Sequence, residues 1–245
     1  MDFFDLKNIA ERFMEILNPI SEEKIIRIGE LLGLKKDDHV IDFGCGYAEP
    51  LAIWSSEFEI NGVGIDIRPH ACDRAKKKLV NLGFRDRIEI ICMDASKYEY
   101  KHGEFDAATC IGATFIWGGF GKTIRGMKPA LKPGSKMAIG EVFWLTDNVP
   151  PECYKYFEFA RKENELLQEA WDEGFEIEHI LRATDQDFDA YESGNWFGLL
   201  KWLEENPDHQ ERDDVLAHLH DSQDEYFRFG HKYLGWAVFI LRVKS

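Results

Sequence analysis

Hydrophobic and polar residues follow two different periods along the chain, and these periods divide it into predicted helices and strands. Apolar residues recur at helical spacing over 3–17 and 22–33, and Asn18-Pro19 separates the two segments. We therefore predict two N-terminal helices. Short apolar runs typical of buried strands follow, and they occupy 39–46, 62–67, 88–95, 106–113, 136–144, 175–184 and 235–243.

Helical segments lie between these strands. Pro50 begins one helix, Gly83 ends another over 69–82, and Lys132-Pro133-Gly134 is a turn signature after a third. Strands that alternate with helices predict a mostly parallel sheet with helices on both faces. Towards the end of the chain, helical spacing covers 152–173 and 187–205, and an acidic segment covers 208–225.

These elements predict one α/β domain built on a doubly wound, seven-stranded, mostly parallel sheet. A helical cover over 1–36 precedes the core at 37–184. A helical insertion, a candidate lid, covers 185–234, and the final strand lies in 235–245. Because a long excursion precedes this final strand, we expect it to run antiparallel to its neighbours.

Composition narrows the class of function. The formal net charge of −15 opposes approach to nucleic acids and to anionic membrane surfaces. No apolar run reaches the length of a membrane span, and the acidic N-terminal segment is unlike a secretory signal, so we expect a soluble, cytoplasmic protein. The five cysteines form no C-x-x-C pair and the histidines no H-E-x-x-H motif, so we expect reduced thiols and no metal site.

The loop after the first strand indicates the ligand. It reads Asp42-Phe43-Gly44-Cys45-Gly46-Tyr47-Ala48-Glu49, and its glycines allow a sharp turn and close approach of the backbone. A dinucleotide fingerprint needs a third glycine where Glu49 stands, and this carboxylate would repel a pyrophosphate. The segment 116–123 ends like a phosphate loop but lacks the first glycine. A cationic ligand without phosphate suits the acidic loop better.

Asp42-x-Gly44-x-Gly46-x-Ala48 resembles the first motif of class I methyltransferases, which bind S-adenosylmethionine (SAM) and release S-adenosylhomocysteine (SAH). Ala48 replaces the third glycine of that motif, a change we expect to be tolerated if the position requires a small side chain and not a positive φ. The segment MKPALKPGSKMAIGE also resembles this family. GATFIWGGFGKT, GEVFW and GWAVFIL resemble poorly characterised prokaryotic methyltransferases related to the UbiE type.

The resemblance implies the class I methyltransferase fold, with the last strand antiparallel, and a set of cofactor-binding residues. Asp66 would accept hydrogen bonds from the ribose and Asp94-Ala95 would contact the adenine, although both aspartates are equally able to cap the helices that follow them. The implied cofactor-binding residues are Asp42, Gly44, Cys45, Gly46, Asp66, Ile67, Asp94, Ala95, Ile111 and Gly112.

The methyl acceptor should lie over the ends of the fourth and fifth strands. Glu141 is the candidate catalytic base or acceptor-binding carboxylate; the alternative is that it bonds neighbouring backbone. Trp117 and Trp144 are candidates for stacking on the acceptor, or else for core packing. From the C-terminal half, further aromatic candidates for acceptor binding are Tyr154, Tyr191 and Trp196.

We therefore predict a SAM-dependent methyltransferase that acts on an oxygen, nitrogen or carbon atom of a small molecule, as a monomer or homodimer. A SAM-binding regulatory or sensing protein without catalysis is one alternative, and an RNA methyltransferase is another that the acidic charge disfavours. A fourth hypothesis, a nicotinamide dehydrogenase, is weakened by the presence of Glu49 in the loop.

Overall fold

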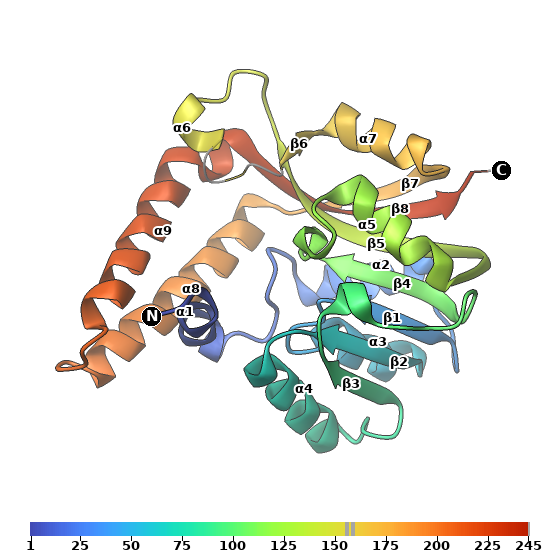
Figure 1. The fold of residues 1–245 in the computed structure, drawn as a ribbon, viewed down its shortest axis with the longest axis horizontal. Coiled ribbons are helices and arrows are strands. Elements are labelled where there is room, and N and C mark those ends of the chain that lie inside the picture. Colours follow the sequence, from blue (N-terminus) through green and yellow to red (C-terminus); the bar gives the residue numbers. More distant parts are fainter. Residues whose placement is uncertain (155–156, 158–159, 245) are drawn as a thin grey trace.

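The computed structural model describes residues 1–154, 157 and 160–244. Its centre is a single twisted sheet (Figure 1), and in the described part of the chain this sheet has eight strands. They are β1 (His39–Phe43), β2 (Asn61–Asp66), β3 (Ile88–Cys92), β4 (Phe105–Ile111), β5 (Leu131–Trp144), β6 (Arg161–Lys162), β7 (Phe175–Arg182) and β8 (Leu234–Val243).

The strand order is β3-β2-β1-β4-β5-β8-β7, and the two residues of β6 pair with the end of β5. β8 is antiparallel to both β5 and β7, whereas the other pairs are parallel. The predicted fold class is therefore confirmed, with β6 as a short additional strand. From β1 the chain adds β2 and β3 on one side, and then β4 on the other side of β1. The strand order therefore reverses between β1 and β4, where open α/β sheets place their ligands.

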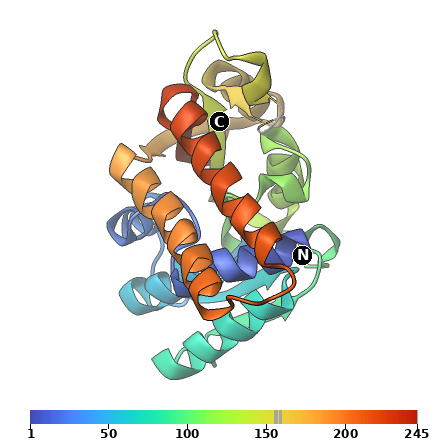
Figure 2. The same ribbon diagram turned by 90° about the vertical axis from the view of Figure 1, so that its left-hand side faces the viewer.

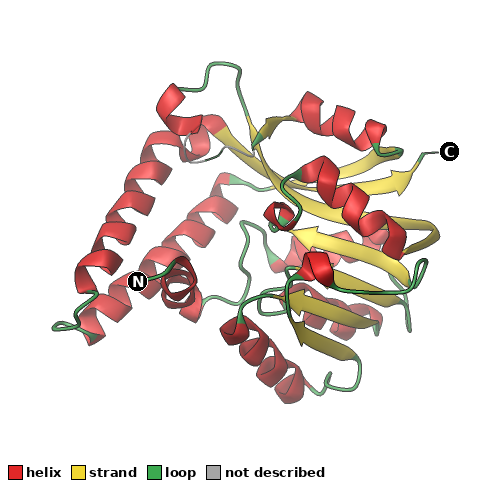
Figure 3. Ribbon diagram, in the orientation of Figure 1, coloured by secondary structure: helices red, strands yellow, loops and turns green. Residues whose placement is uncertain are grey.

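Helices cover both faces of the sheet (Figure 3) because successive strand residues point to opposite sides. Val40 of β1 packs with the helices on one face, and Ile41 packs with those on the other. The first face carries α2 (Glu22–Leu32), α3 (Glu49–Phe58) and α4 (Pro69–Leu82), and the second carries α5 (Phe120–Met127) and α7 (Glu163–Asp172). Short 3-10 turns are η2 (Ala95–Lys97), η3 (Thr114–Ile116) and η4 (Lys128–Ala130).

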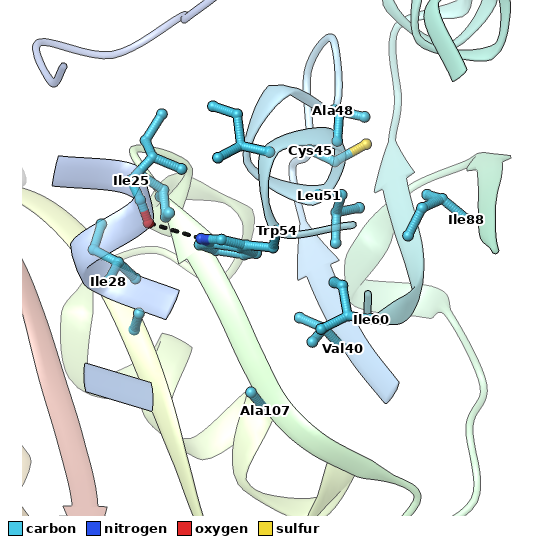
Figure 4. Close-up of a cluster of buried hydrophobic side chains, with 14 of the residues drawn as sticks. Ile25, Ile28, Val40, Cys45, Ala48, Leu51, Trp54, Ile60, Ile88 and Ala107 are labelled. Carbon is cyan, nitrogen blue, oxygen red and sulfur yellow. Dashed lines mark hydrogen bonds between the residues drawn. The ribbon is translucent and has the colours of Figure 1, made fainter. Parts of the chain in front are cut away.

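Trp54 of α3 is the largest fully buried side chain of the first face. Its indole Nε1 donates a hydrogen bond of 2.7 Å to the carbonyl oxygen of Ile25 in α2, as Figure 4 shows. The ring therefore buries a large apolar surface while its one polar atom is satisfied. This contact joins α2 to α3, whose N-terminus follows the glycine loop.

A helical lobe lies beyond the carboxyl ends of the parallel strands (Figure 1). It consists of α1 (Phe3–Ala10), α8 (Asp185–Glu205) and α9 (Arg212–Tyr233), and Figure 2 shows α8 and α9 lying side by side. The lobe has its own apolar cluster, formed by Ala10, Leu199, Leu203, Val215 and Leu219. α8 and α9 lie in the segment predicted as an insertion over 185–234, and α1 lies in the predicted N-terminal cover, whose second helix, α2, packs instead against the sheet.

Two predicted helices are shorter than their apolar spacing indicates. The helix expected over 3–17 ends at Ala10 and continues only as a 3-10 turn, η1 (Glu11–Phe13). The helix expected over 152–173 is divided into α6 (Pro151–Tyr154) and α7, with β6 between them. Residues 155–156 and 158–159 of that prediction lie outside the described residues, as does Ser245 of the predicted final segment. None of the described helices is long and apolar enough to cross a membrane.

Candidate active site

The loop after β1 is held by the backbone of β2. The amide groups of Gly44 and Cys45 donate hydrogen bonds of 2.8 and 3.0 Å to the carbonyl oxygen of Ile65. Gly44 has φ +76°, and a Cβ at this position would lie 2.5 Å from the Cβ of Ala113. Only glycine adopts this positive φ without strain and also lacks the Cβ that would clash with Ala113. The loop therefore lies tightly against the segment that follows β4 and leaves its backbone open to a ligand.

Ala48 departs from our expectation for the third position of the motif. It caps α3 with φ +57° and ψ +29°, in the left-handed region. The position therefore requires a positive φ and not merely a small side chain. A residue with a Cβ pays roughly 1–2 kcal/mol for this conformation, so the change from the family's glycine stores local strain.

Asp66, at the end of β2, is almost fully buried at 7% exposure. One carboxylate oxygen accepts a hydrogen bond of 2.9 Å from the amide of Gly46, and the other accepts one of 2.8 Å from the amide of Arg68. The side chain thus fixes the glycine loop. A carboxylate offers about four lone-pair directions, so two remain for a ligand's hydroxyl groups.

Asp94 precedes η2 and caps it, as the alternative interpretation of its sequence position predicts. Its Oδ1 accepts hydrogen bonds from the amide and the hydroxyl of Ser96, at 3.0 and 2.7 Å, and its Oδ2 lies 3.0 Å from the Lys97 ammonium. These hydrogen bonds, first that of the Ser96 hydroxyl, lower the pKa of Asp94. Asp94 also lines the cavity described below, so its capping role does not remove it from the site.

Asp42 lies within β1, buried beneath the glycine loop. Its carboxyl group accepts a hydrogen bond of 2.7 Å from the Thr109 hydroxyl of β4. Burial raises the pKa of Asp42 to about 7, and the hydrogen bond from Thr109 only partly offsets this. This carboxyl group is therefore partly protonated near neutral pH, so its negative charge is reduced.

One cavity of about 400 Å³ joins these segments. Its lining comes from the ends of β1, β2 and β4, from the turn after β3, and from the N-terminal part of the chain. All the residues predicted to bind the cofactor line it, namely Asp42, Gly44, Cys45, Gly46, Asp66, Ile67, Asp94, Ala95, Ile111 and Gly112. The sequence motifs thus converge on a single site, while the role of each residue stays a prediction.

The N-terminal segment 14–20, which we call the strap, adds lining residues that the sequence does not predict. Arg74 of α4 donates hydrogen bonds to the carbonyl oxygens of Arg12 (2.8 Å) and Met14, which holds the chain extended where a helix is expected. Lys78 of α4 pairs with Glu15 at 2.6 Å. The strap contributes Glu15, Ile16, Leu17, Asn18 and Ile20 to the cavity wall.

A buried ion pair anchors the start of the strap to β2. The Arg68 guanidinium donates a hydrogen bond of 2.6 Å to the carboxylate of Glu11, and both side chains line the cavity. Lys7 of α1 lies 3.5 Å from the same carboxylate. The Arg68 guanidinium also lies 3.6 Å from Asp66, so these two cations face two carboxylates, which disfavours phosphate as the ligand.

Glu141 lies inside β5, which continues to Trp144, and not beyond the end of the strand. Its carboxyl group accepts hydrogen bonds from the Thr114 hydroxyl (2.5 Å) and the Val142 amide (2.9 Å). Burial raises the pKa of Glu141 to about 7, and these two hydrogen bonds oppose the shift. Among the described residues the cavity wall does not include Glu141.

Three of the predicted acceptor-binding aromatics contact other aromatic rings of the protein. The ring of Trp117 contacts that of Phe43 edge-on, with centroids 5.2 Å apart. Trp144 is buried, contacts the ring of Tyr154 at 5.0 Å, and donates a hydrogen bond of 3.1 Å to the carbonyl oxygen of Ala160. Trp117, Trp144 and Tyr154 therefore contact other aromatic side chains of the protein instead of lining the cavity.

The two aromatic candidates on α8 differ in position. Tyr191 lines the cavity, and its hydroxyl accepts a hydrogen bond of 3.4 Å from the Lys7 ammonium. Trp196 packs against Tyr226 of α9, with ring centroids 5.6 Å apart, and so joins the two helices of the lobe. Of these two residues, Tyr191 lies at the cavity with the predicted cofactor-binding residues, and Trp196 does not.

The cavity fits SAM in size and in chemistry. Pockets for small molecules commonly enclose about 300–1,000 Å³, and this one lies at the switch between β1 and β4. Asp66, which is predicted to bind the ribose, has carboxylate lone pairs left for hydroxyl groups. Gly46 lets the strap residue Leu17 approach the loop, since a Cβ on Gly46 would lie 2.9 Å from the Leu17 side chain. Ile67, half-exposed beside Asp66, offers an apolar surface to a flat base.

A doubly wound sheet that ends in a reversed strand, with an acidic glycine loop at its switch point, defines the class I methyltransferases. Residues 40–134 match a family of methyltransferase domains. The chain is 32% identical over 246 residues to the uncharacterized protein YjhP of Escherichia coli (strain K12), and the match covers 98% of this chain and 99% of YjhP.

Two crystal structures of SAM-dependent methyltransferases, both in complex with SAH, are similar over their whole length. The enzyme from Geobacter sulfurreducens is 31% identical with a TM-score of 0.91, and the match covers 98% of each chain. The enzyme from Thiobacillus denitrificans is 30% identical with a TM-score of 0.91, and all of both chains is covered. The present chain therefore belongs to the family of SAM-dependent methyltransferases, and its cofactor is SAM.

Proposed function

We propose that the protein transfers a methyl group from SAM to an oxygen, nitrogen or carbon atom of a small, largely apolar molecule. The observation that carries this proposal is a group of exposed phenylalanines at the cavity. Phe3 and Phe4 of α1 are 63% and 46% exposed, Phe115 of η3 is 67% exposed, and all three line the cavity. Exposed apolar side chains gathered at a concave site are typical of a surface that binds an apolar ligand.

The position of these phenylalanines separates them from the predicted cofactor residues. Phe115 follows β4, which lies two strands away from β2, whose end carries Asp66. The other side of the cavity therefore remains for the acceptor. The Lys7 ammonium and the Tyr191 hydroxyl, which are bonded to each other, offer polar contacts that would orient an acceptor among apolar walls.

SAM supplies an electrophilic methyl group on its sulfonium, so the protein mainly has to orient the acceptor and exclude water. α1 and the strap lie over the cavity and serve the second purpose. Glu141 holds Thr114, the first residue of η3, and so fixes the element that carries Phe115. We therefore propose a positioning role for Glu141 in place of the catalytic role that its sequence position predicts.

The proposal is tested by incubating the purified protein with SAM labelled on its methyl group. A panel of apolar phenols, aromatic amines and fatty acids is compared with RNA and with peptides. We expect labelled product from members of the small-molecule panel. Label that enters RNA or peptides but none of the small molecules, or the absence of any SAM binding, would overturn the proposal.

Two variants separate the acceptor side from the cofactor side. Phe115→Ala should raise the KM for an apolar acceptor at least several-fold while SAH affinity stays unchanged. Leu82→Ala, which removes another exposed apolar side chain (52%) at the end of α4 and outside the cavity lining, is the matched control and should alter neither quantity.

A further inference from the structure

Asn18, in the middle of the strap, lies against the residue that follows β4. A Cβ built on Gly112 would overlap the side-chain oxygen Oδ1 of Asn18, and Gly112 has φ +79°. Gly112 is itself tied to the sheet, because its amide donates a hydrogen bond of 3.1 Å to the carbonyl oxygen of Gly140 in β5. The amide group of Asn18 therefore occupies the space that a side chain at 112 would need.

The side chain of Asn18 lines the cavity and makes no hydrogen bond to the described residues. Its backbone carbonyl, by contrast, accepts a hydrogen bond of 2.8 Å from the amide of Ile20, and Pro19 restricts the chain between them. The strap thus places the amide group of Asn18, with one acceptor oxygen and two donor hydrogens, at the cavity on a constrained stretch of backbone.

The strand order determines which part of SAM would reach Asn18. With the adenosyl group at the ends of β2 and β3, beside Asp66 and Asp94, the rest of the molecule extends towards β1 and β4. Gly44 and Gly112 lie at those ends, with Asn18 above Gly112. The part of SAM on that side is its amino-acid group, which carries an ammonium and a carboxylate.

A neutral amide suits the amino-acid group of SAM because the charged side chains nearby are already engaged by other residues. The carboxyl group of Asp42 is buried beneath the glycine loop and already accepts a hydrogen bond from the Thr109 hydroxyl. Arg68 is paired with Glu11, so its guanidinium is already engaged by another carboxylate. A neutral amide can accept from an ammonium and donate to a carboxylate without adding a charge of its own.

We propose that Asn18 binds the amino-acid group of SAM, with Oδ1 accepting from the ammonium and Nδ2 donating to the carboxylate. This inference rests on the placement of SAM given above. The residue that covers Gly112 is then also a ligand of the cofactor.

Calorimetry with two probes tests the proposal. SAH carries the amino-acid group, whereas 5′-methylthioadenosine has the same adenosyl thioether without it. Asn18→Leu keeps the approximate shape of the side chain and removes its polar atoms. Because hydrogen bonds to charged groups are worth about 1.5–3 kcal/mol, this variant should bind SAH about 10–150-fold more weakly. Its affinity for 5′-methylthioadenosine should change less than about twofold, which also shows that the site is folded.

Asn8→Leu makes the same chemical change on α1 at a residue outside the cavity lining and should leave both affinities unaltered. If Asn18→Leu binds SAH as tightly as the wild type, or loses affinity for both probes equally, Asn18 only shapes the pocket and the proposal is refuted. If the wild type binds neither probe, the cofactor placement itself is wrong, and the proposed function fails with it.

Discussion

Asp66 fixes the glycine loop and is predicted to bind the ribose of SAM, so we expect its removal to have two measurable effects. In the free protein, Asp66→Ala leaves the amides of Gly46 and Arg68 without their acceptor. An unsatisfied buried donor costs about 1–3 kcal/mol, so the free energy of unfolding should fall by at least this amount. In the complex, hydrogen bonds from the ribose to a charged acceptor are also lost. This loss is worth about 1.5–3 kcal/mol, so the affinity for SAH should fall about 10–150-fold.

Calorimetric titration with SAH measures the second effect, and urea denaturation measures the first. Asp106→Ala is the matched control. Its carboxylate likewise accepts a backbone hydrogen bond, of 2.9 Å from His39, and pairs with Lys132 at 2.8 Å, but it lies at the start of β4, at the opposite edge of the sheet. This control should lose stability and keep its SAH affinity. The reasoning is refuted if Asp66→Ala keeps its SAH affinity within twofold, or if the control loses as much.

Three further predictions concern stability. Ala48→Gly should raise the free energy of unfolding by about 0.5–1 kcal/mol in urea denaturation, since it relieves the left-handed strain, whereas Ala52→Gly inside α3 should lower it by about 1 kcal/mol. Burial raises the pKa of Glu141, so the wild-type protein loses stability as pH rises from 4.5 through 7 and this carboxyl group ionises. Thermal unfolding should therefore show Glu141→Gln gaining roughly 1–3 kcal/mol relative to the wild type over that range. An unchanged difference between pH 5 and 8 would contradict this. Glu11→Ala should lower stability by up to about 3–5 kcal/mol, since the buried Arg68 guanidinium loses its partner at 2.6 Å and keeps Asp66 at 3.6 Å. An equal loss in Glu205→Ala, which breaks an exposed pair, would contradict the burial argument.

The sequence predicts residues that the structure brings to one cavity because these residues lie at the ends of consecutive strands. Gly44, Asp66 and Asp94 each follow or end an apolar run, and parallel strands bring their carboxyl ends to one edge of the sheet. For these residues, a position at the end of an apolar run therefore also predicts a position at the ligand-binding edge of the sheet. The mostly parallel sheet follows from the alternation of strands and helices, and the reversed final strand is expected from the long excursion that precedes it.

The covering side of the site could not be predicted because tertiary contacts override the local pattern there. The apolar spacing over 3–17 indicates a helix, but Arg74 takes backbone carbonyl oxygens from that segment and keeps the strap extended. Likewise, the strand predicted over 136–144 does end at Trp144, but the apolar pattern does not determine what the side chain of Glu141 contacts. In the structure it accepts a hydrogen bond from Thr114 and lies away from the cavity.

The place of β8 in the sheet has a consequence for synthesis on the ribosome. β8 lies between β5 and β7, yet it is made more than fifty residues after β7. Until it emerges, both neighbours have exposed edges that can pair with other nascent chains, and the apolar side chains that pack against β8 stay in water. Release of a chain that stops within α9 would therefore yield an aggregation-prone species, even though every residue of the glycine loop would already be present.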